Sequence, residues 1–244
     1  MALATDTASD PAVLDDLAAL PPRSRWSLAS VLLVQSLNAF NDNFVKMLII
    51  AFAGAVAHGQ DIGDSMQVYL GAIFSLPYVL FAPIAGWLSD RWSKQRVIFW
   101  MQVLQVFVFL TFIGALWLHQ TQLTLYLSLV AFFLLATQAA FFSPAKMGII
   151  KELVGTRRLG GANGMLQMTM FIGILSGMWA GGTWFGARLA ATNDPWSAVW
   201  VPMLAVTILA LLQIAGALTV ARTPTHPEVK FERRVFWEHF THLR

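Results

Sequence analysis

Six long apolar stretches dominate the sequence and limit what it can fold into. They run over residues 27–57, 66–89, 97–118, 123–144, 160–186 and 198–221. Each has about 20 or more mostly apolar residues, the length that an α-helix needs to cross a hydrocarbon core of about 30 Å. Only 12% of the residues are charged, about half the usual share in a soluble domain. The sequence therefore predicts an all-α membrane protein with six transmembrane helices.

The basic residues are distributed unevenly between the predicted connections. Of the 16 Lys and Arg residues, 14 lie before the first span, after the last one, or in the connections 90–96 and 145–159. The connections 58–65 and 119–122 contain none, and on that side Arg188 is the exception. Because Lys and Arg favour the cytoplasmic side of short loops, both termini are predicted to be cytoplasmic.

Two segments flank the predicted bundle of residues 26–222. Residues 1–25 contain four aspartates and lack the apolar core of a signal peptide, so we expect a disordered cytoplasmic tail. In residues 223–244, four apolar residues fall on one helical face: Val229, Phe236, Phe240 and Leu243. This spacing favours a helix lying on the cytoplasmic membrane interface, and an aromatic linker is the alternative.

A polar stripe crosses the first predicted helix. Gln35, Asn38, Asp42 and Lys46 fall within an arc of about 80°. Asp42 lies at the middle of the span, where a carboxylate costs about 2.5–3.5 kcal/mol on insertion scales. Lys46 follows four residues later, a spacing at which its ammonium can meet the carboxylate. We interpret the stripe as the lining of a substrate or ion pathway. The alternative is an ion pair that holds this helix to its neighbours.

Further amides occur at bilayer depth on the other predicted helices. They are Gln102, Gln105, Gln138, Gln167 and Gln213. Each one alone is more typical of a hydrogen bond between helices than of a ligand-binding group. Together they indicate an interior that water can enter.

The second span ends in a charged motif, GWLSDRWSKQR at residues 86–96. An acid at the end of one helix, followed by three cations, can lock neighbouring helices together by charge pairs. The pattern resembles the cytoplasmic loop signature of the major facilitator superfamily, with Ser93 where that family usually has glycine. The resemblance implies gating roles for Gly86, Asp90, Arg91, Lys94 and Arg96, and we expect Gly86 to let another backbone approach closely.

Glycines recur along the fifth span at a helical spacing. Gly173, Gly177 and Gly181 are four residues apart and form one seam, followed by Gly182 and Gly186. Such a seam lets a neighbouring helix pack backbone to backbone, so we assign these five glycines to helix packing. The run is similar to the glycine motif of superfamily exchangers, but Met178 stands where proline is expected, so we do not infer exchange.

Three segments resemble bacterial lysophospholipid transporters and the related modules fused to acyltransferase and acyl-carrier-protein (acyl-ACP) synthetase domains. They are QSLNAFNDN at 35–43, SPAKMGIIKEL at 143–153 and ANGMLQ at 162–167. The resemblance extends from the first span to the fifth. It implies facilitated movement of a lysophospholipid, such as lysophosphatidylethanolamine, across the bacterial inner membrane for reacylation.

The resemblance also implies roles for single residues. Lys146 would end the fourth helix near a cytoplasmic gate and meet a headgroup phosphate, and Glu152 would belong to the same gate. Gln167 stands where these transporters commonly have Glu, and Met147 where they commonly have Tyr. The predicted pathway residues are Gln35, Asn38, Asn41, Asp42, Asn43, Lys46, Gln138, Lys146, Asn163 and Gln167.

Superfamily carriers have about twelve helices in two halves, each built from inverted three-helix repeats. The chain is similar to an amino-terminal half with a 3+3 repeat, which implies a carboxy-terminal half as partner and an acyltransferase or acyl-ACP synthetase as a further one. The strings KMLII at 46–50 and KMGII at 146–150 are 100 residues apart and fit this repeat.

Other functional classes find less support in the sequence. A superfamily carrier of a different solute, such as a drug, is the main alternative. For an enzyme, we find no His followed by Asp five residues later, no HExxH, no P-loop and no nucleophile elbow. The absence of cysteine excludes thiolate zinc sites, and a net charge of only +3 gives no indication of nucleic acid. We therefore expect no metal, no cofactor and no catalysis. A membrane protein with a purely structural role is a further alternative.

Overall fold

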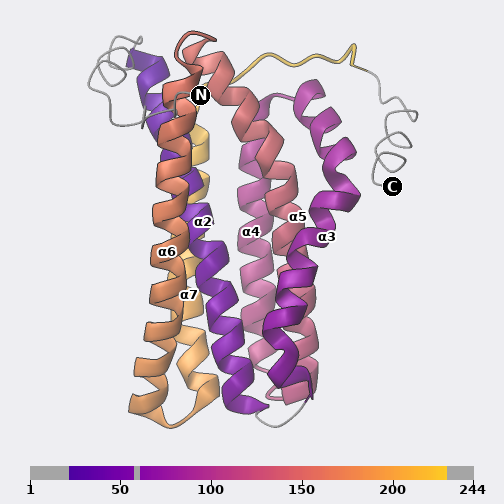
Figure 1. Cartoon of the computed structure of the whole chain (residues 1–244), viewed down its shortest axis with the longest axis vertical. Coiled ribbons are helices and arrows are strands. Elements are labelled where there is room, and N and C mark those ends of the chain that lie inside the picture. The colour runs from indigo at the N-terminus through magenta and orange to yellow at the C-terminus, as the bar shows by residue number, and fades with distance from the viewer. Residues whose placement is uncertain (1–21, 58–60, 230–244) are drawn as a thin grey trace, which may run out of the picture.

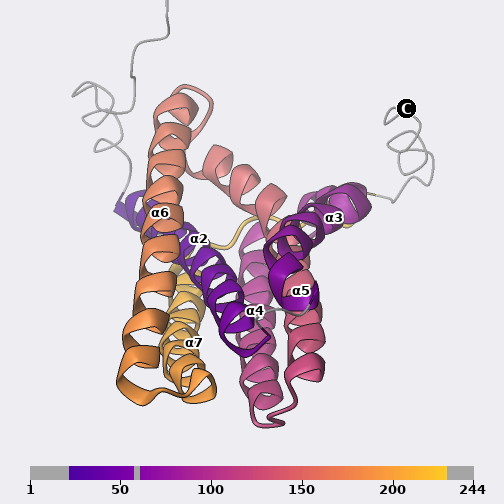
Figure 2. The same ribbon diagram turned by 60° about the horizontal axis from the view of Figure 1, so that its bottom comes forward.

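The computed structural model describes residues 22–57 and 61–229, and these form six long helices with no strand among them. The helices are α2 (Pro22–Val56), α3 (Asp61–Arg91), α4 (Lys94–Leu116), α5 (Thr121–Val154), α6 (Leu159–Thr192) and α7 (Pro195–Thr219). They run along one long axis, and α2 crosses the bundle obliquely between α6 and α3 (Figures 1 and 2). The predicted all-α, six-helix fold is confirmed.

Five of the six described helices are long and apolar enough to cross a membrane by length and composition. They are α2, α3 from Ser65 onward, α4, α5 and α7. The remaining helix, α6, is as long as α5 and is rich in glycine. Its contact with α2 is the most extensive contact between any two of the described helices.

The helices extend beyond the predicted spans. Residues 22–25, predicted as tail, belong to α2, and α5 continues through Pro144 to Val154. Lys146 therefore lies within a helix and does not end it. The apolar pattern marks only the part of a helix that lipid or core covers. Backbone hydrogen bonds continue into polar turns, and neighbouring helices allow a proline inside a membrane helix.

Helices α2, α3 and α4 and helices α5, α6 and α7 pack in equivalent ways. The counterparts are α2 and α5, α3 and α6, and α4 and α7. The contact between α2 and α6 therefore corresponds to that between α5 and α3, and the contact between α4 and α5 corresponds to that between α7 and α2. Helices α4 and α7 contact each other. Each helix of the second trio begins about 100 residues after its counterpart. This is the packing expected of a 3+3 repeat.

Two apolar cores occupy the two ends of the bundle. The core at the end that holds both described chain ends includes Val31, Ile98, Ile149 and Leu166. The other core includes Phe44, Leu48, Phe109, Phe112 and Phe132. On α2, the polar segment 35–43 lies between the residues of these two cores. The fold thus places the polar stripe midway along the bundle.

Asp194 starts α7 after a tight turn. Asn193 adopts a left-handed conformation with φ 51°, and the Asp194 carboxylate accepts hydrogen bonds from the N–H groups of Trp196 at 3.1 Å and Ser197 at 3.0 Å. Slight burial acts to raise the pKa of Asp194, but these N–H donors outweigh it and hold the pKa below its ordinary value of 3.8. Asp194 is thus a charged N-cap.

A segment that we call the strap, residues 220–229, crosses the end of the bundle after α7 (Figure 1, yellow trace). The N–H of Ala221 donates to Ser27 Oγ at 3.0 Å, and the indole N–H of Trp87 on α3 donates to the carbonyl of Val229 at 3.3 Å. The strap is not helical. The predicted interfacial helix therefore does not begin before residue 230, and Phe236, Phe240 and Leu243 lie outside the described residues.

Candidate substrate pathway

Three residues of the predicted stripe lie together in the middle of the bundle. Gln35 and Asn38 are buried, and Asp42 is partly buried. The side-chain N–H of Asn38 donates to Asp42 Oδ2 at 2.9 Å, one helical turn away. The carboxylate is therefore held by an amide on its own helix.

Amides from α4 and α5 complete this network. Gln102 and Gln138 donate to Asn38 Oδ1 at 3.5 and 3.1 Å, and Gln105 donates to Asp42 Oδ1 at 3.3 Å. Asn38 and Gln138 are 100 residues apart, the offset of the predicted repeat, and they bond to each other. Gln102 and Gln105 are not among the predicted pathway residues, although their spacing of three on one buried helix could have indicated them.

The same glutamines leave acceptors unused. The Oε1 atoms of Gln102, Gln105 and Gln138 are buried and have no hydrogen-bond partner among the described residues. A buried unsatisfied acceptor costs about 1–3 kcal/mol, so three of them around one carboxylate require an explanation. The region can accept additional N–H or O–H donors from water or from a bound molecule.

The cation beside Asp42 is Lys146 of α5. Its Nζ donates to Gln35 Oε1 at 3.0 Å, lies 5.5 Å from the centre of the Phe142 ring, and is close enough to Asp42 to interact electrostatically. Asp42 and Lys46 form no ion pair in the described structure, so the expected pairing along α2 is wrong. Amides on α2 and α4 already engage both carboxylate oxygens.

The other predicted pathway residues lie outside this network. Asn41 is buried and donates to the carbonyl of Val206 on α7 at 3.4 Å. Asn43 donates to the carbonyl of Ala39 in its own helix at 2.8 Å. Gln167 is exposed on α6, and Asn163 on the same helix has a buried Oδ1 without a described partner. Asn41 and Asn43 thus bond to backbone carbonyls, and no hydrogen bond joins Asn163 or Gln167 to Asp42 among the described residues.

Two of the residues assigned to gating form an ion pair, Asp90 and Arg96 are exposed, and Gly86 and Arg91 are partly buried. Lys94 of α4 pairs with Glu152 of α5 at 2.5 Å, and its side chain is only 10% exposed. Asp90 is exposed and forms no ion pair with a described residue. A Cβ at Gly86 would meet open space, so the expected close approach of a backbone there is wrong.

The glycine seam on α6 faces α2. A Cβ at Gly173, Gly177 or Gly181 would collide with the carbonyl oxygens of Ser36, Phe40 and Phe44 in turn. The two helices thus pack backbone to backbone at three positions over about two turns. Gly182 and Gly186 meet nothing within 4 Å, so their assignment to this packing is wrong. The helical face on which a glycine lies, and not glycine content or spacing alone, defines the contact.

The family profile described as Major Facilitator Superfamily matches residues 31–244. The chain belongs to the major facilitator superfamily. Among solved structures, this superfamily member is similar to a POT family transporter in complex with a thioalcohol-conjugated peptide. The TM-score is 0.61 at 15% identity over 93% of this chain and 47% of that one. A second POT peptide transporter, in complex with sulfate, gives 0.57 at 14% identity over 95% and 47%. At this identity the likeness concerns the fold alone.

Curated relatives of this superfamily member carry the name lysophospholipid transporter LplT. The protein of Photorhabdus laumondii is 34% identical over 155 residues, 64% of this chain and 35% of its own length. That of Citrobacter koseri is 32% identical over 65% and 37%, and that of Salmonella typhimurium 34% over the same shares. The chain spans about a third of the length of these relatives.

Proposed function

We propose that this chain is the amino-terminal six-helix half of a carrier that moves lysophospholipids across the bacterial inner membrane for reacylation. The observation that carries the proposal is an acid and a base on two contacting helices, Asp42 on α2 and Lys146 on α5, among unused acceptors in a chain similar to lysophospholipid transporters. An acid and a base at bilayer depth are costly and typical of transport pathways.

The chemistry of the network suits a zwitterionic headgroup. The phosphate of lysophosphatidylethanolamine would bind the ammonium of Lys146, because an anionic oxygen attracts the ammonium more strongly than the neutral amide oxygen of Gln35 does. The ethanolamine ammonium has three N–H donors, and Asp42 together with the free glutamine oxygens offers acceptors for them. Both ends of the headgroup would then be satisfied away from water.

The single acyl chain requires apolar walls beside this polar region. Aromatic side chains of α3 and α5 face each other near the network, with ring centres 5.9 Å apart for Phe81 and Phe141 and 6.1 Å apart for Phe74 and Phe132. These four residues are the candidates for contact with the chain. An amphipathic cargo would thus find polar and apolar surfaces on adjacent helices.

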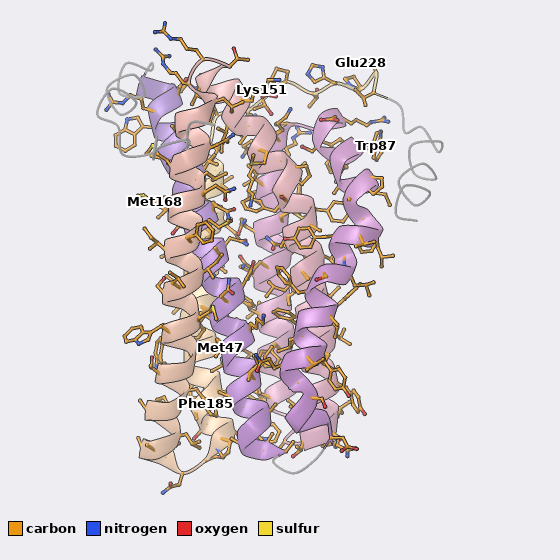
Figure 3. All side chains as sticks on the ribbon, in the orientation of Figure 1. Met47, Trp87, Lys151, Met168, Phe185 and Glu228 are labelled. Atoms are coloured by element: carbon orange, nitrogen blue, oxygen red, sulfur yellow. The ribbon has the colours of Figure 1, made fainter. Side chains whose placement is uncertain are left out.

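The distribution of the basic residues supports an assignment of both ends of the bundle's chain to one side of the membrane. Arg91, Arg96, Lys151 and Arg157 lie in or beside the connections at the end where α2 begins and α7 ends. Lys151 is labelled at this end in Figure 3. By the positive-inside rule we assign this end to the cytoplasm of a bacterial inner membrane. We propose a carboxy-terminal half as the structural partner and an acyltransferase or acyl-ACP synthetase as the functional one. The chain itself acts as a carrier and not as an enzyme.

Uptake of radiolabelled lysophosphatidylethanolamine by spheroplasts that express the complete protein tests this function. We expect Lys146→Gln to reduce uptake at least about 10-fold, because it removes the positive charge assigned to the phosphate. Lys151→Gln is the matched control, since Lys151 lies on the same helix but is exposed. Wild-type uptake by Lys146→Gln would contradict the proposal. Export of a drug without lysophospholipid uptake would favour a carrier of another solute.

A further inference from the structure

A polar cavity lies at the proposed cytoplasmic end of the bundle, where the chain passes from α3 to α4. It has a volume of about 580 Å³ and is lined by Arg91, Trp92, Ser93, Arg96, Trp100, Thr225 and Pro227. None of these residues belongs to the network around Asp42. The cavity therefore needs an explanation that the cargo pathway does not supply.

The lining is basic and has no acidic member. Arg91 and Arg96 contribute two guanidinium groups, and the remaining side chains are hydroxyl, indole or apolar. Arg91 lies over the ring of Trp87 at 5.4 Å. Guanidinium groups present a planar fork of N–H donors that matches the oxygens of a phosphate. The charge of this cavity is complementary to an anion of that kind.

The two tryptophans continue into a lipid-facing surface. Trp92 is 45% and Trp100 54% exposed, as expected for indoles at a membrane interface. Phe107 and Leu110, seven and ten residues after Trp100, are also exposed and share its helical face. This apolar row leads from the cavity along α4 toward the middle of the bundle. A phosphate in the cavity would therefore lie at the start of an apolar row along α4 that acyl chains could contact.

The strap closes one side of the cavity with Thr225 and Pro227. It is fixed in place because the N–H of His226 donates to the carbonyl of Arg91 at 3.0 Å, and Thr223 Oγ1 accepts from the N–H of Lys94 at 2.8 Å. In Figure 3, Glu228 on the strap and Trp87 on α3 mark this end of the bundle. A segment far along the chain thus builds the wall.

We propose that this cavity binds the phosphate of an anionic phospholipid from the cytoplasmic leaflet, with its acyl chains along the exposed face of α4. The apolar row favours a lipid over a free phosphate ester, because a soluble ester would make no use of it. The site is separate from the cargo network, so its occupancy does not depend on which solute the carrier moves. It rests only on the proposed orientation of the bundle.

Native mass spectrometry of the complete protein, titrated with palmitoyl-oleoyl-phosphatidylglycerol in detergent, tests the site. We expect Arg91→Gln with Arg96→Gln to weaken lipid retention at least about 10-fold. The substitutions keep the backbone carbonyl that holds His226. Lys151→Gln with Arg157→Gln removes the same charge from exposed positions at the same end, and we expect it to retain the lipid. Elution of both variants as single peaks in size-exclusion chromatography establishes that they are folded.

Three results would overturn the proposal. Undiminished retention by the first variant would show that the arginines do not hold the lipid. Equal losses in both variants would show general surface attraction and no site. Displacement of the lipid by equimolar glycerol 3-phosphate would show that the cavity selects a soluble phosphate ester. A shortened acyl chain that weakens binding in the wild type, but not in Trp100→Ala, would support the path along α4.

Discussion

The contact between α6 and α2 gives a prediction about stability, tested by Gly177→Ala. A Cβ at this position would collide with the carbonyl oxygen of Phe40 and lie 3.0 Å from its Cα and 3.1 Å from its carbonyl carbon. All three atoms are backbone, so no side-chain rotation can relieve the contact. Helix α6 must move away from α2, which loosens the packing along the whole seam.

The size of the effect follows from comparison with Gly182→Ala. Alanine stabilises a helix by up to about 1 kcal/mol over glycine, and this gain applies to both substitutions. A Cβ at Gly182 meets open space, so that variant keeps the gain. Overpacking of a close contact costs about 1–3 kcal/mol. We therefore expect Gly177→Ala to be less stable than Gly182→Ala by about 1–3 kcal/mol.

Thermal unfolding of the two purified variants in the same detergent, followed by size-exclusion chromatography after heating, measures this difference. The expected order of melting temperatures is Gly182→Ala at or above the wild type, and Gly177→Ala below both. Gly181→Ala should also have a melting temperature below that of the wild type, because its Cβ would lie 2.5 Å from the carbonyl oxygen of Phe44. Equal melting temperatures for Gly177→Ala and Gly182→Ala would refute backbone-to-backbone packing.

Three further predictions concern charged residues. Lys46→Ala should lower lysophospholipid uptake less than Lys146→Ala, because Lys146 is the cation beside Asp42, and a larger loss from Lys46→Ala in spheroplasts would contradict this. Asp194→Ala should cost about 0.5–1 kcal/mol of stability at neutral pH. Because the folded pKa of Asp194 is lowered, its contribution is present above pH 3.8 and fades as the pH falls further, so melting curves of variant and wild type should converge in acid. Glu152→Gln should destabilise more than the pair Glu152→Gln with Lys94→Met in thermal unfolding, because it leaves a buried ammonium without its carboxylate.

The helices and much of the stripe could be predicted because they depend on local periodicity. Apolar length alone locates six helices, and a period of 3.6 residues places Gln35, Asn38 and Asp42 on one face. Their hydrogen bonds join that face to α4 and α5. The helix ends were less predictable, because α5 and α6 continue into turns without an apolar pattern.

The partners within the site could not be predicted because they depend on how helices pack. The spacing of Lys46 allowed an ion pair with Asp42, yet the carboxylate is engaged by amides, and the nearby cation comes from α5. Likewise, Gly182 follows Gly181 directly, but a rotation of 100° turns it away from α2. The sequence indicates which residues share a helical face, whereas the contacts of that face depend on how the helices pack.

The most direct test of the carrier proposal is uptake of labelled lysophosphatidylethanolamine by spheroplasts that express wild type or Asp42→Asn in equal folded amounts. The substitution keeps the size of the side chain but removes the charge, and the single amide oxygen of Asn can accept from Asn38 or from Gln105 but not from both. The proposed pathway predicts near-complete loss of uptake although the variant is present in the same folded amount as the wild type. Wild-type uptake by Asp42→Asn would contradict a role for this carboxylate in moving the cargo.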